Sequence, residues 1–445
     1  MPVFRRKIYE KMVQWKEEKS GSTALMIEGA RRVGKSTIVE QFAKENYRSY
    51  IMIDFSEVGD EIKSIFSVFS RNKDLFFSRL QLFTNTRLYE RDSLIIFDEV
   101  QRFPRAREMI KFLVKDGRYD YMETGSLISL IENTRNIQIP SEEESISMYP
   151  MDFEEFLWAM EKDQIPVLRE LYLNNESLGA SAHDVMMDDF RAFMVIGGMP
   201  QAVSTYKETK DLMKVESVKR MILDLYRSDI LKIKKESTRM NALALFNNLP
   251  SLLSSPNKVF LPGKIKKGSK TKQYRYALEW LELAKIFNKC IETNDPSVAL
   301  RLNDGDSFKC YLLDTGLLIS LAFGKSDNTL RAAYESLLKG DLGINEGMFF
   351  ENVVAQELVS SGRELVFYRK KKDDNRYYEV DFILRGADGL VPVEIKSGRS
   401  GRHRSLDVFS ELYKSRIEQT IVIHTKDLET RGGIRYIPAY MVEFL

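Results

Sequence analysis

The segment that most constrains how this chain can fold is residues 29–37, which read Gly-Ala-Arg-Arg-Val-Gly-Lys-Ser-Thr. It follows a short apolar run at residues 24–28 and precedes Ile38, Val39 and Phe42, which recur at helical spacing. A strand that enters a helix through a glycine-rich loop directs several backbone N–H groups, and the positive end of the helix dipole, at one point. The sequence therefore predicts a phosphate-binding loop with ATP as its ligand.

The side chains of this loop have separate predicted roles. Lys35 is expected to reach the β- and γ-phosphates, and the Ser36 hydroxyl is expected to be a ligand of Mg²⁺. Two arginines add positive charge at the loop. The residues predicted to bind the nucleotide are Gly29, Ala30, Arg31, Arg32, Val33, Gly34, Lys35, Ser36 and Thr37.

Two catalytic carboxylates are predicted further along the chain. Phosphoryl transfer to water needs a carboxylate for Mg²⁺, a base for the water and a contact to the γ-phosphate. An apolar run ends in Asp98 and Glu99, so Asp98 is expected to hold Mg²⁺ and Glu99 to polarise the attacking water. The next strand ends at Thr124-Gly-Ser126, where Thr124 or Ser126 either contacts the γ-phosphate or only forms a turn.

The composition indicates a globular chain. Of its 445 residues, 30% are charged and 43% are apolar, and this length predicts several domains. No run of about 18 apolar residues occurs, so no membrane span is expected, and the basic N-terminus lacks a following apolar segment. Cys290 and Cys310 are too few for a disulfide framework or a zinc cluster. We therefore expect a cytoplasmic protein.

Charge is distributed unevenly, although the net charge is only +2. Basic stretches at residues 264–275, 369–372 and 396–404 all lie in the C-terminal half. Each alone is typical of a solvated face, but three together favour a nucleic acid, DNA or RNA, as a partner. Gln101 is expected to help position water or nucleic acid. An arginine finger is not placed by the sequence, and the candidates are Arg102, Arg105, Arg118 and Arg227.

Patterns of strands and helices divide the chain into four predicted domains. Residues 1–150 alternate between the two, which predicts a mostly parallel sheet covered by helices on both faces. Its strands are expected at residues 24–28, 49–54, 93–97 and 119–124, with a connector at 137–145. Residues 151–240 are expected to be helical, with one break at 195–200. Residues 241–340 predict a winged-helix-like domain with helices at 241–249 and 270–287 and strands at 289–293 and 308–313.

The last predicted domain, residues 341–445, has the order helix, strand, hairpin, helix, strand. Its hairpin is expected to turn at residues 386–389, which brings Asp381 beside Glu394 and Lys396 on one face. Two carboxylates and a lysine can bind Mg²⁺ or Mn²⁺ and activate water for phosphodiester cleavage, and Glu351 is expected to complete the metal site. The alternative is a cross-strand salt bridge on a solvated face.

At this point the sequence resembles a known family. The loop, Ile53-Asp-Phe55, Phe97-Asp-Glu-Val-Gln101 and Thr124-Gly-Ser126 resemble AAA-type ATPases of bacteria and archaea, whose C-terminal half is a region of unknown function. Matches to that half are found at residues 153–157, 197–200, 311–316 and 349–354. The resemblance covers nearly the whole chain and implies an ATPase core, a winged-helix-like middle and a nuclease-like C-terminal domain.

The C-terminal carboxylates resemble a second pattern, the restriction-endonuclease-like or PD-(D/E)xK fold, in which an acidic residue is followed by Glu-x-Lys. The predicted fold class is therefore α/β: a P-loop NTPase sheet, a helical and winged-helix-like middle, and a PD-(D/E)xK-like domain. The predicted function is Mg²⁺-dependent ATP hydrolysis, with nucleic acid engaged through the C-terminal domain. The alternative is a nucleotide-gated switch whose inactive nuclease-like domain docks a protein partner.

Overall fold

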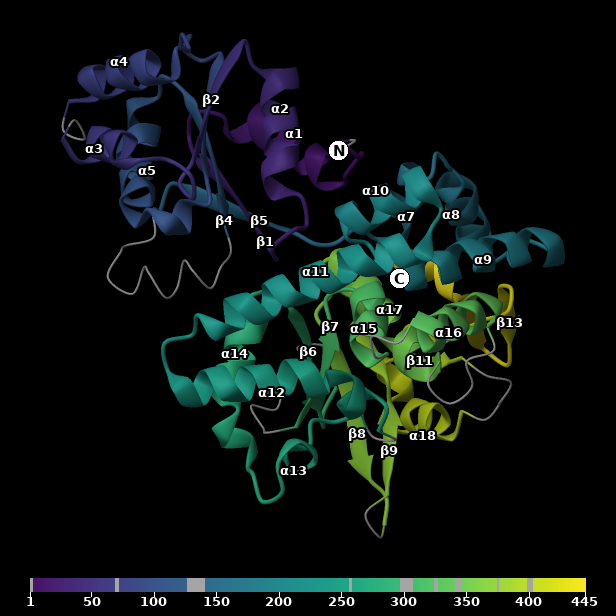
Figure 1. Ribbon diagram of the computed structural model, residues 1–445. Coiled ribbons are helices and arrows are strands. Elements are labelled where there is room, and N and C mark those ends of the chain that lie inside the picture. Colours follow the sequence, from purple (N-terminus) through teal and green to yellow (C-terminus); the bar gives the residue numbers. More distant parts are fainter. Residues whose placement is uncertain are drawn as a thin grey trace. The chain divides into compact units, whose positions relative to one another are not determined.

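The computed structural model describes residues 3–68, 72–125, 141–255, 258–296, 307–323, 327–340, 346–373, 376–397 and 403–445. The chain forms two compact units. Unit 1 comprises residues 1–149 and 283–285, and unit 2 comprises 150–282 and 286–445. Because their mutual placement is not determined, each unit is described by itself (Figure 1).

Unit 1 is built on a five-stranded sheet in the order β2-β3-β4-β1-β5, and all neighbouring strands are parallel. The strands are β1 (Ala24–Gly29), β2 (Ser49–Asp54), β3 (Ser93–Asp98), β4 (Asp120–Gly125) and β5 (Glu143–Met148). The first four confirm the predicted strands and the parallel sheet. The connector predicted at 137–145 is wrong from residue 143 onward, since Glu143 pairs with Ala24 at the start of β5. Its residues 137–140 lie outside the described part of the chain.

Helices cover both faces of this sheet (Figure 1). On one face lie α1 (Ile8–Lys19) and α2 (Lys35–Asn46), and on the other lie α3 (Asp60–Val68), α4 (Lys73–Thr84) and α5 (Pro104–Asp116). Behind α3–α5 the rings of Phe55, Phe66 and Phe97 pack edge to face, with centroids 5.4 to 5.9 Å apart. Burying each such side chain stabilises the unit by about 1.5–3 kcal/mol, so this aromatic core fixes β3, at whose end the predicted catalytic carboxylates lie.

The first part of unit 2 is helical, as predicted for residues 151–240. Its helices are α7 (Phe153–Ala159), α8 (Ile165–Asn174), α9 (Ala180–Ile196), α10 (Pro200–Thr209) and α11 (Leu212–Leu231). The predicted break is confirmed between α9 and α10. There Gly197 adopts the left-handed φ of 83°, and the Gly198 N–H donates to the Asp314 carboxylate at 2.6 Å. The glycines therefore let the turn approach Asp314 closely.

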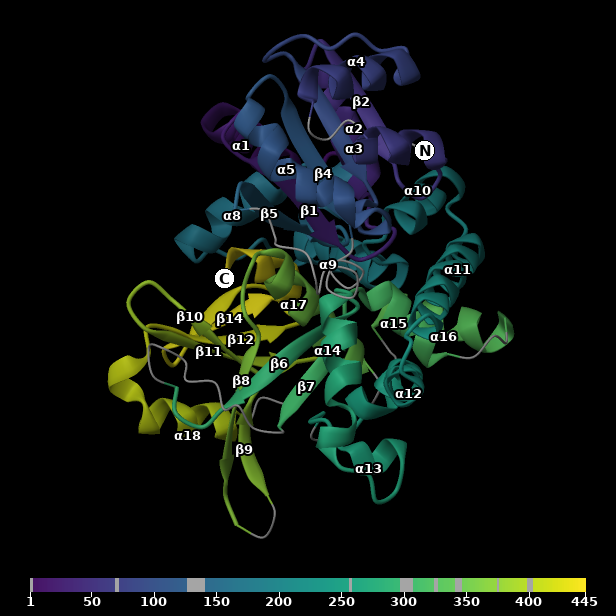
Figure 2. The same ribbon diagram turned by 90° about the vertical axis from the view of Figure 1, so that its left-hand side faces the viewer.

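Two mixed sheets form the rest of unit 2 (Figure 2). One has the order β7-β6-β8-β9, formed by β6 (Phe287–Thr293), β7 (Phe308–Leu312), β8 (Val366–Lys371) and β9 (Tyr377–Val380). The other has the order β10-β11-β12-β14-β13, formed by β10 (Phe382–Arg385), β11 (Leu390–Lys396), β12 (Thr420–His424), β13 (Glu429–Arg431) and β14 (Ile434–Pro438). Strand β6 pairs with β7 and also with β8, so strands from two predicted domains share one sheet. The domain boundaries inside unit 2 stay predictions.

The remaining helices of unit 2 surround these sheets. They are α12 (Glu236–Leu253), α13 (Pro262–Ile265), α14 (Arg275–Leu283), α15 (Thr315–Ala322), α16 (Asp327–Lys339), α17 (Glu346–Ser360) and α18 (Arg404–Leu412). The helix predicted at 270–287 is shorter, because Lys285 adopts a left-handed φ of 55° and β6 follows directly. Helix α17 contacts strands of both sheets, which brings Glu351 towards the β10–β11 hairpin. None of the described helices combines the length and apolar character needed to cross a membrane.

Candidate active site

The loop between β1 and α2 takes its shape from its two glycines. A Cβ at Gly29 would lie 2.3 Å from the Met148 carbonyl oxygen, so only glycine lets β5 approach this closely. Gly34 has a φ of 101°, in the left-handed region that disfavours other residues, and α2 begins directly after it. The Arg6 side chain also fixes the loop, donating to the carbonyl oxygens of Val33 at 2.9 Å and Tyr149 at 2.7 Å. Sequence reasoning missed Arg6, since no motif includes it.

Lys35 lies inside this loop and is only 6% exposed. Its ammonium group donates to the carbonyl oxygens of Gly29 and Ala30, at 3.0 Å each. Burial lowers the pKa of Lys35, while the charges of Glu99 and Asp98 act in the opposite direction. The hydrogen bonds of Lys35 go to neutral carbonyl groups, which the oxygens of a phosphate can replace.

At the end of β3, Asp98 accepts hydrogen bonds from two hydroxyl groups. The Ser36 hydroxyl donates to Asp98 Oδ1 at 2.8 Å, and the Thr124 hydroxyl donates to the same oxygen. The structure therefore brings together the predicted residues Ser36, Asp98 and Thr124. A hydroxyl and a carboxylate in contact are oxygen ligands that suit Mg²⁺, so these residues fit the predicted metal. Ser126 lies outside the described residues.

Glu99 is held in place by its own backbone and by two neighbours. It has a left-handed φ of 52°, and its N–H donates to the Thr124 hydroxyl at 3.2 Å. Its carboxylate accepts a hydrogen bond of 2.5 Å from the Gln101 side chain. Gln101 fits there because a Cβ at Gly125 would lie 2.5 Å from Gln101 Oε1. Gln101 was singled out from the sequence, but its contact with Glu99 was not predicted.

Two of the four candidate arginine fingers are engaged within their own unit. Arg118 pairs with Asp116 at 2.5 Å and with Asp74 at 2.7 Å. Arg227 pairs with Asp224 at 2.7 Å. These ion pairs are partly exposed, and the identity of an arginine finger stays unassigned.

The predicted C-terminal residues also come together. Phe382 pairs with Val393 in the antiparallel β10–β11 hairpin, and the Ile395 N–H donates to Asp381 Oδ2 at 2.8 Å. A cavity of about 360 Å³ is lined by all four predicted side chains, namely Glu351, Asp381, Glu394 and Lys396. Lys258 and Glu379, which sequence reasoning missed, line it as well.

Burial and charge set the protonation of this cavity. Burial raises the pKa of Asp381 and of Glu394 above the ordinary range. For Glu351 burial acts in the same direction, but the charges of Lys258 and Lys309 outweigh it and hold the pKa below the ordinary range. The Lys396 ammonium lies 2.5 Å from Glu394 Oε1, but both residues belong to β11, so this pair is not the cross-strand salt bridge that was considered as the alternative.

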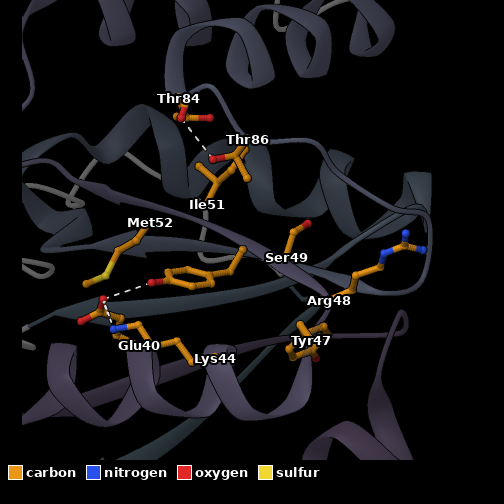
Figure 3. A pocket seen from close by; sticks show the side chains of 10 residues that line it. Glu40, Lys44, Tyr47, Arg48, Ser49, Ile51, Met52, Thr84 and Thr86 are labelled. Atoms are coloured by element: carbon orange, nitrogen blue, oxygen red, sulfur yellow. Dashed lines mark hydrogen bonds and ion pairs between the residues drawn. The ribbon is translucent and has the colours of Figure 1, made fainter.

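A second cavity of about 610 Å³ lies along edge strand β2 of unit 1 and includes none of the predicted residues (Figure 3). Glu40 lines this cavity and contacts two of the other lining residues. Its Oε1 atom accepts a hydrogen bond from Tyr50 at 3.1 Å and lies 2.6 Å from the Lys44 ammonium (Figure 3). Lys44 therefore neutralises Glu40, and Arg48 adds a further positive charge to the lining.

Three family models match parts of the chain. Residues 21–157 match the model described as AAA domain. Residues 187–329 and 346–442 match models described as Domain of unknown function (DUF8612) and Domain of unknown function (DUF4143). Unit 1 therefore carries an AAA-type P-loop ATPase domain, a class that generally uses ATP and Mg²⁺. No curated protein matches this chain in sequence.

Similar solved structures are remote. The Walker-type ATPase PABY2304 of Pyrococcus abyssi is 15% identical, and the match covers 72% of this chain and 96% of that one with a TM-score of 0.42. AMPPCP-bound DnaA from Aquifex aeolicus is 12% identical over 63% of this chain and 89% of that one, with a TM-score of 0.30. CDC6P from Pyrobaculum aerophilum is 10% identical over 77% and 97%, with a TM-score of 0.30. Identities of 10–15% with TM-scores of 0.30–0.42 do not indicate a shared activity.

Proposed function

We propose that unit 1 binds ATP with Mg²⁺ and hydrolyses it. The observation that carries this proposal is the meeting of Ser36, Asp98 and Thr124 through hydrogen bonds, at the ends of adjacent strands and beside the buried Lys35. Mg²⁺ held by the Ser36 hydroxyl and the Asp98 carboxylate would neutralise charge that develops on the phosphate oxygens.

The side chains divide the remaining work. Lys35 leaves its two carbonyl partners and contacts the β- and γ-phosphates. Thr124 orients the Glu99 backbone N–H and the Asp98 carboxylate through its hydroxyl group, and it contacts the γ-phosphate. Glu99 accepts the proton of the attacking water, which requires its carboxylate to turn away from Gln101.

The test of this proposal is the substitution Glu99→Gln. Glutamine keeps the size of the side chain but cannot accept the proton, so ATP should still bind while hydrolysis slows by about a hundredfold. Gln101→Ala is the matched control, because it removes the contact to Glu99 and leaves the base intact. Hydrolysis by Glu99→Gln at the wild-type rate would show that Glu99 is not the base.

We also propose that unit 2 engages nucleic acid. The lysines of the 264–275 stretch support this, because Lys264, Lys266, Lys267 and Lys270 are exposed around α13. The β8–β9 hairpin adds Lys370 and Lys371, and it extends outward from unit 2, as α13 does, in both views (Figure 1, Figure 2). Exposed cations on projecting elements are suited to phosphate backbones.

The C-terminal part of unit 2 is proposed to be restriction-endonuclease-like. Its support is that Glu351, Asp381, Glu394 and Lys396 line one cavity. The Lys396–Glu394 pair favours the second candidate function, in which this domain is inactive and docks a protein partner under the control of ATP. Salt-dependent binding to duplex DNA separates the two, since phosphate contacts weaken steeply as salt rises.

A further inference from the structure

A buried ammonium group contacts three carboxylates that line the C-terminal cavity, although its own residue is not part of the lining. Lys309, on β7, is 0% exposed. Its Nζ atom is 2.8 Å from Glu379 Oε1, 3.3 Å from Glu351 Oε1 and 3.8 Å from Asp381 Oδ1. These carboxylates come from β9, from α17 and from the residue between β9 and β10. One cation therefore joins three separate elements of the unit.

This lysine remains charged. Burial alone would lower its pKa, but Glu351, Glu379 and Asp381 outweigh burial and raise the pKa well above the ordinary range. Buried charges persist in proteins when partners of opposite sign surround them, and here three carboxylates do so.

Glu351 and Asp381 also have partners other than Lys309. Glu351 accepts a hydrogen bond of 2.5 Å from Tyr311 and pairs with Lys258 through its second oxygen. Asp381 Oδ2 accepts the Ile395 N–H. Across the described ranges, no group of three or more histidine, cysteine, aspartate or glutamate side chains is arranged to hold a metal ion. Glu351 and Asp381 as they stand therefore do not fit the Mg²⁺ or Mn²⁺ predicted from the sequence, and of the predicted ligands only Glu394 keeps a buried oxygen with no hydrogen-bond partner, Oε2.

We propose that Lys309 is the resident cation of this cavity. Its ammonium group neutralises Glu351, Glu379 and Asp381 from outside the cavity lining, so these carboxylates keep their positions and charge balance without a metal. This proposal is independent of ATP hydrolysis and of nucleic-acid binding, because it concerns only what neutralises the carboxylates.

The test is whether removal of the ammonium creates a metal site. Lys309→Met keeps the length of the side chain and removes its charge, which leaves three carboxylates facing one another. In the full chain we expect its melting temperature to fall in EDTA and to recover with Mn²⁺, and calorimetry to detect one bound Mn²⁺ at least about tenfold tighter than in the wild type. Lys396→Met is the matched control, since this lysine pairs with Glu394 outside the Lys309 cluster, and it should gain no Mn²⁺ binding.

Two results would overturn the proposal. One is a folded Lys309→Met chain whose melting temperature and calorimetric titration do not respond to Mn²⁺. The other needs no lysine variant: a wild-type chain that binds one Mn²⁺, with Asp381→Asn abolishing that binding, would place a metal where we place Lys309. If Lys309→Met does not fold, this wild-type titration decides alone, and the absence of any Asp381-dependent binding supports the resident cation.

Discussion

Lys35 of unit 1 and Lys309 of unit 2 are both buried but differ in what surrounds them. Lys35 is held by two carbonyl oxygens, whereas Lys309 lies among three carboxylates. A cation whose partners are neutral gains most from an arriving anion, while one already neutralised gains little. This difference supports the proposals that Lys35 binds phosphate and that Lys309 is an internal structural charge.

Lys35→Ala should therefore weaken nucleotide binding. A hydrogen bond to a charged group contributes about 1.5–3 kcal/mol, which corresponds to a loss of affinity of roughly ten- to a hundredfold. Titration with a fluorescent ATP analogue measures it. Lys44→Ala, on the same helix but exposed and paired with Glu40, is the control and should bind as the wild type does. Equal affinity of the Lys35 variant and the wild type would exclude the phosphate contact.

A buried glutamate predicts how the stability of unit 1 depends on pH. Glu123 is 0% exposed, and burial together with the nearby Glu143 raises its pKa well above the ordinary value. The charge of Arg107 opposes this shift only in part, because its side chain pairs with Glu143 at 3.0 and 2.6 Å. The folded state therefore keeps a proton that the unfolded chain has lost. This stabilisation is complete below the unfolded pKa of about 4.3 and disappears as pH rises through the folded pKa.

Glu123→Gln mimics the protonated side chain at every pH. Its melting temperature, relative to that of the wild type, should thus rise as pH is raised from acid to alkaline values. Glu143→Gln is the control, since it breaks the Arg107 pair and should destabilise unit 1 instead. Parallel pH profiles of Glu123→Gln and the wild type would show that Glu123 is ionised in the fold.

At the scale of elements, the sequence predicted the strands and turns that a local pattern of residues determines, but not those that depend on distant residues. Strands β1 and β3 were predictable because each contains a continuous apolar run that becomes almost fully buried. In β2 only Ile51 and Ile53 are buried, and β4 is buried although it contains Asp120 and Glu123. Strand β5 was missed because it opens with two glutamates, and what makes Glu143 tolerable there is Arg107, from a helix 36 residues earlier. The β10–β11 hairpin was predictable from its glycine turn. Lys309 was not, since its nearest carboxylate partner in sequence is Glu351, 42 residues away.

The turn between α9 and α10 supplies a prediction at this scale. Gly197 has a left-handed φ of 83°, and a Cβ there would lie 2.4 Å from Asp314 Oδ1. Gly179 has a similar φ of 87°, but a Cβ there would meet no atom within 4 Å. Gly179→Ala should cost only the backbone strain of about 1–2 kcal/mol, and Gly197→Ala should cost more because Asp314 must move. Urea unfolding measures both, and equal losses would show that Asp314 does not restrict the turn.

At the scale of the whole molecule, the sequence predicted which residues come together at each candidate site better than it predicted which cations neutralise them. The loop follows β1, and Asp98 and Glu99 stand at the end of β3 in the same parallel sheet. The carboxyl ends of parallel strands lie at one edge of a sheet, so the side chains there lie close together. The C-terminal residues were also brought together as predicted, but the cations that accompany them come from β7 and from Lys258, which no motif contains. What these two units do together depends on whether ATP controls the engagement of unit 2.

The most direct measurement of that central claim is the affinity of the full-length Glu99→Gln chain for duplex DNA, with ATP and without nucleotide, over a range of salt. We predict that affinity differs between the two states and that log K falls with log salt at a slope near −0.9 for each phosphate contact, about −4 to −5 for five contacts. Replacing Lys264, Lys266, Lys267 and Lys270 by alanine should flatten the slope. Affinity that is absent, or independent of both salt and ATP, would contradict the account and favour a protein partner.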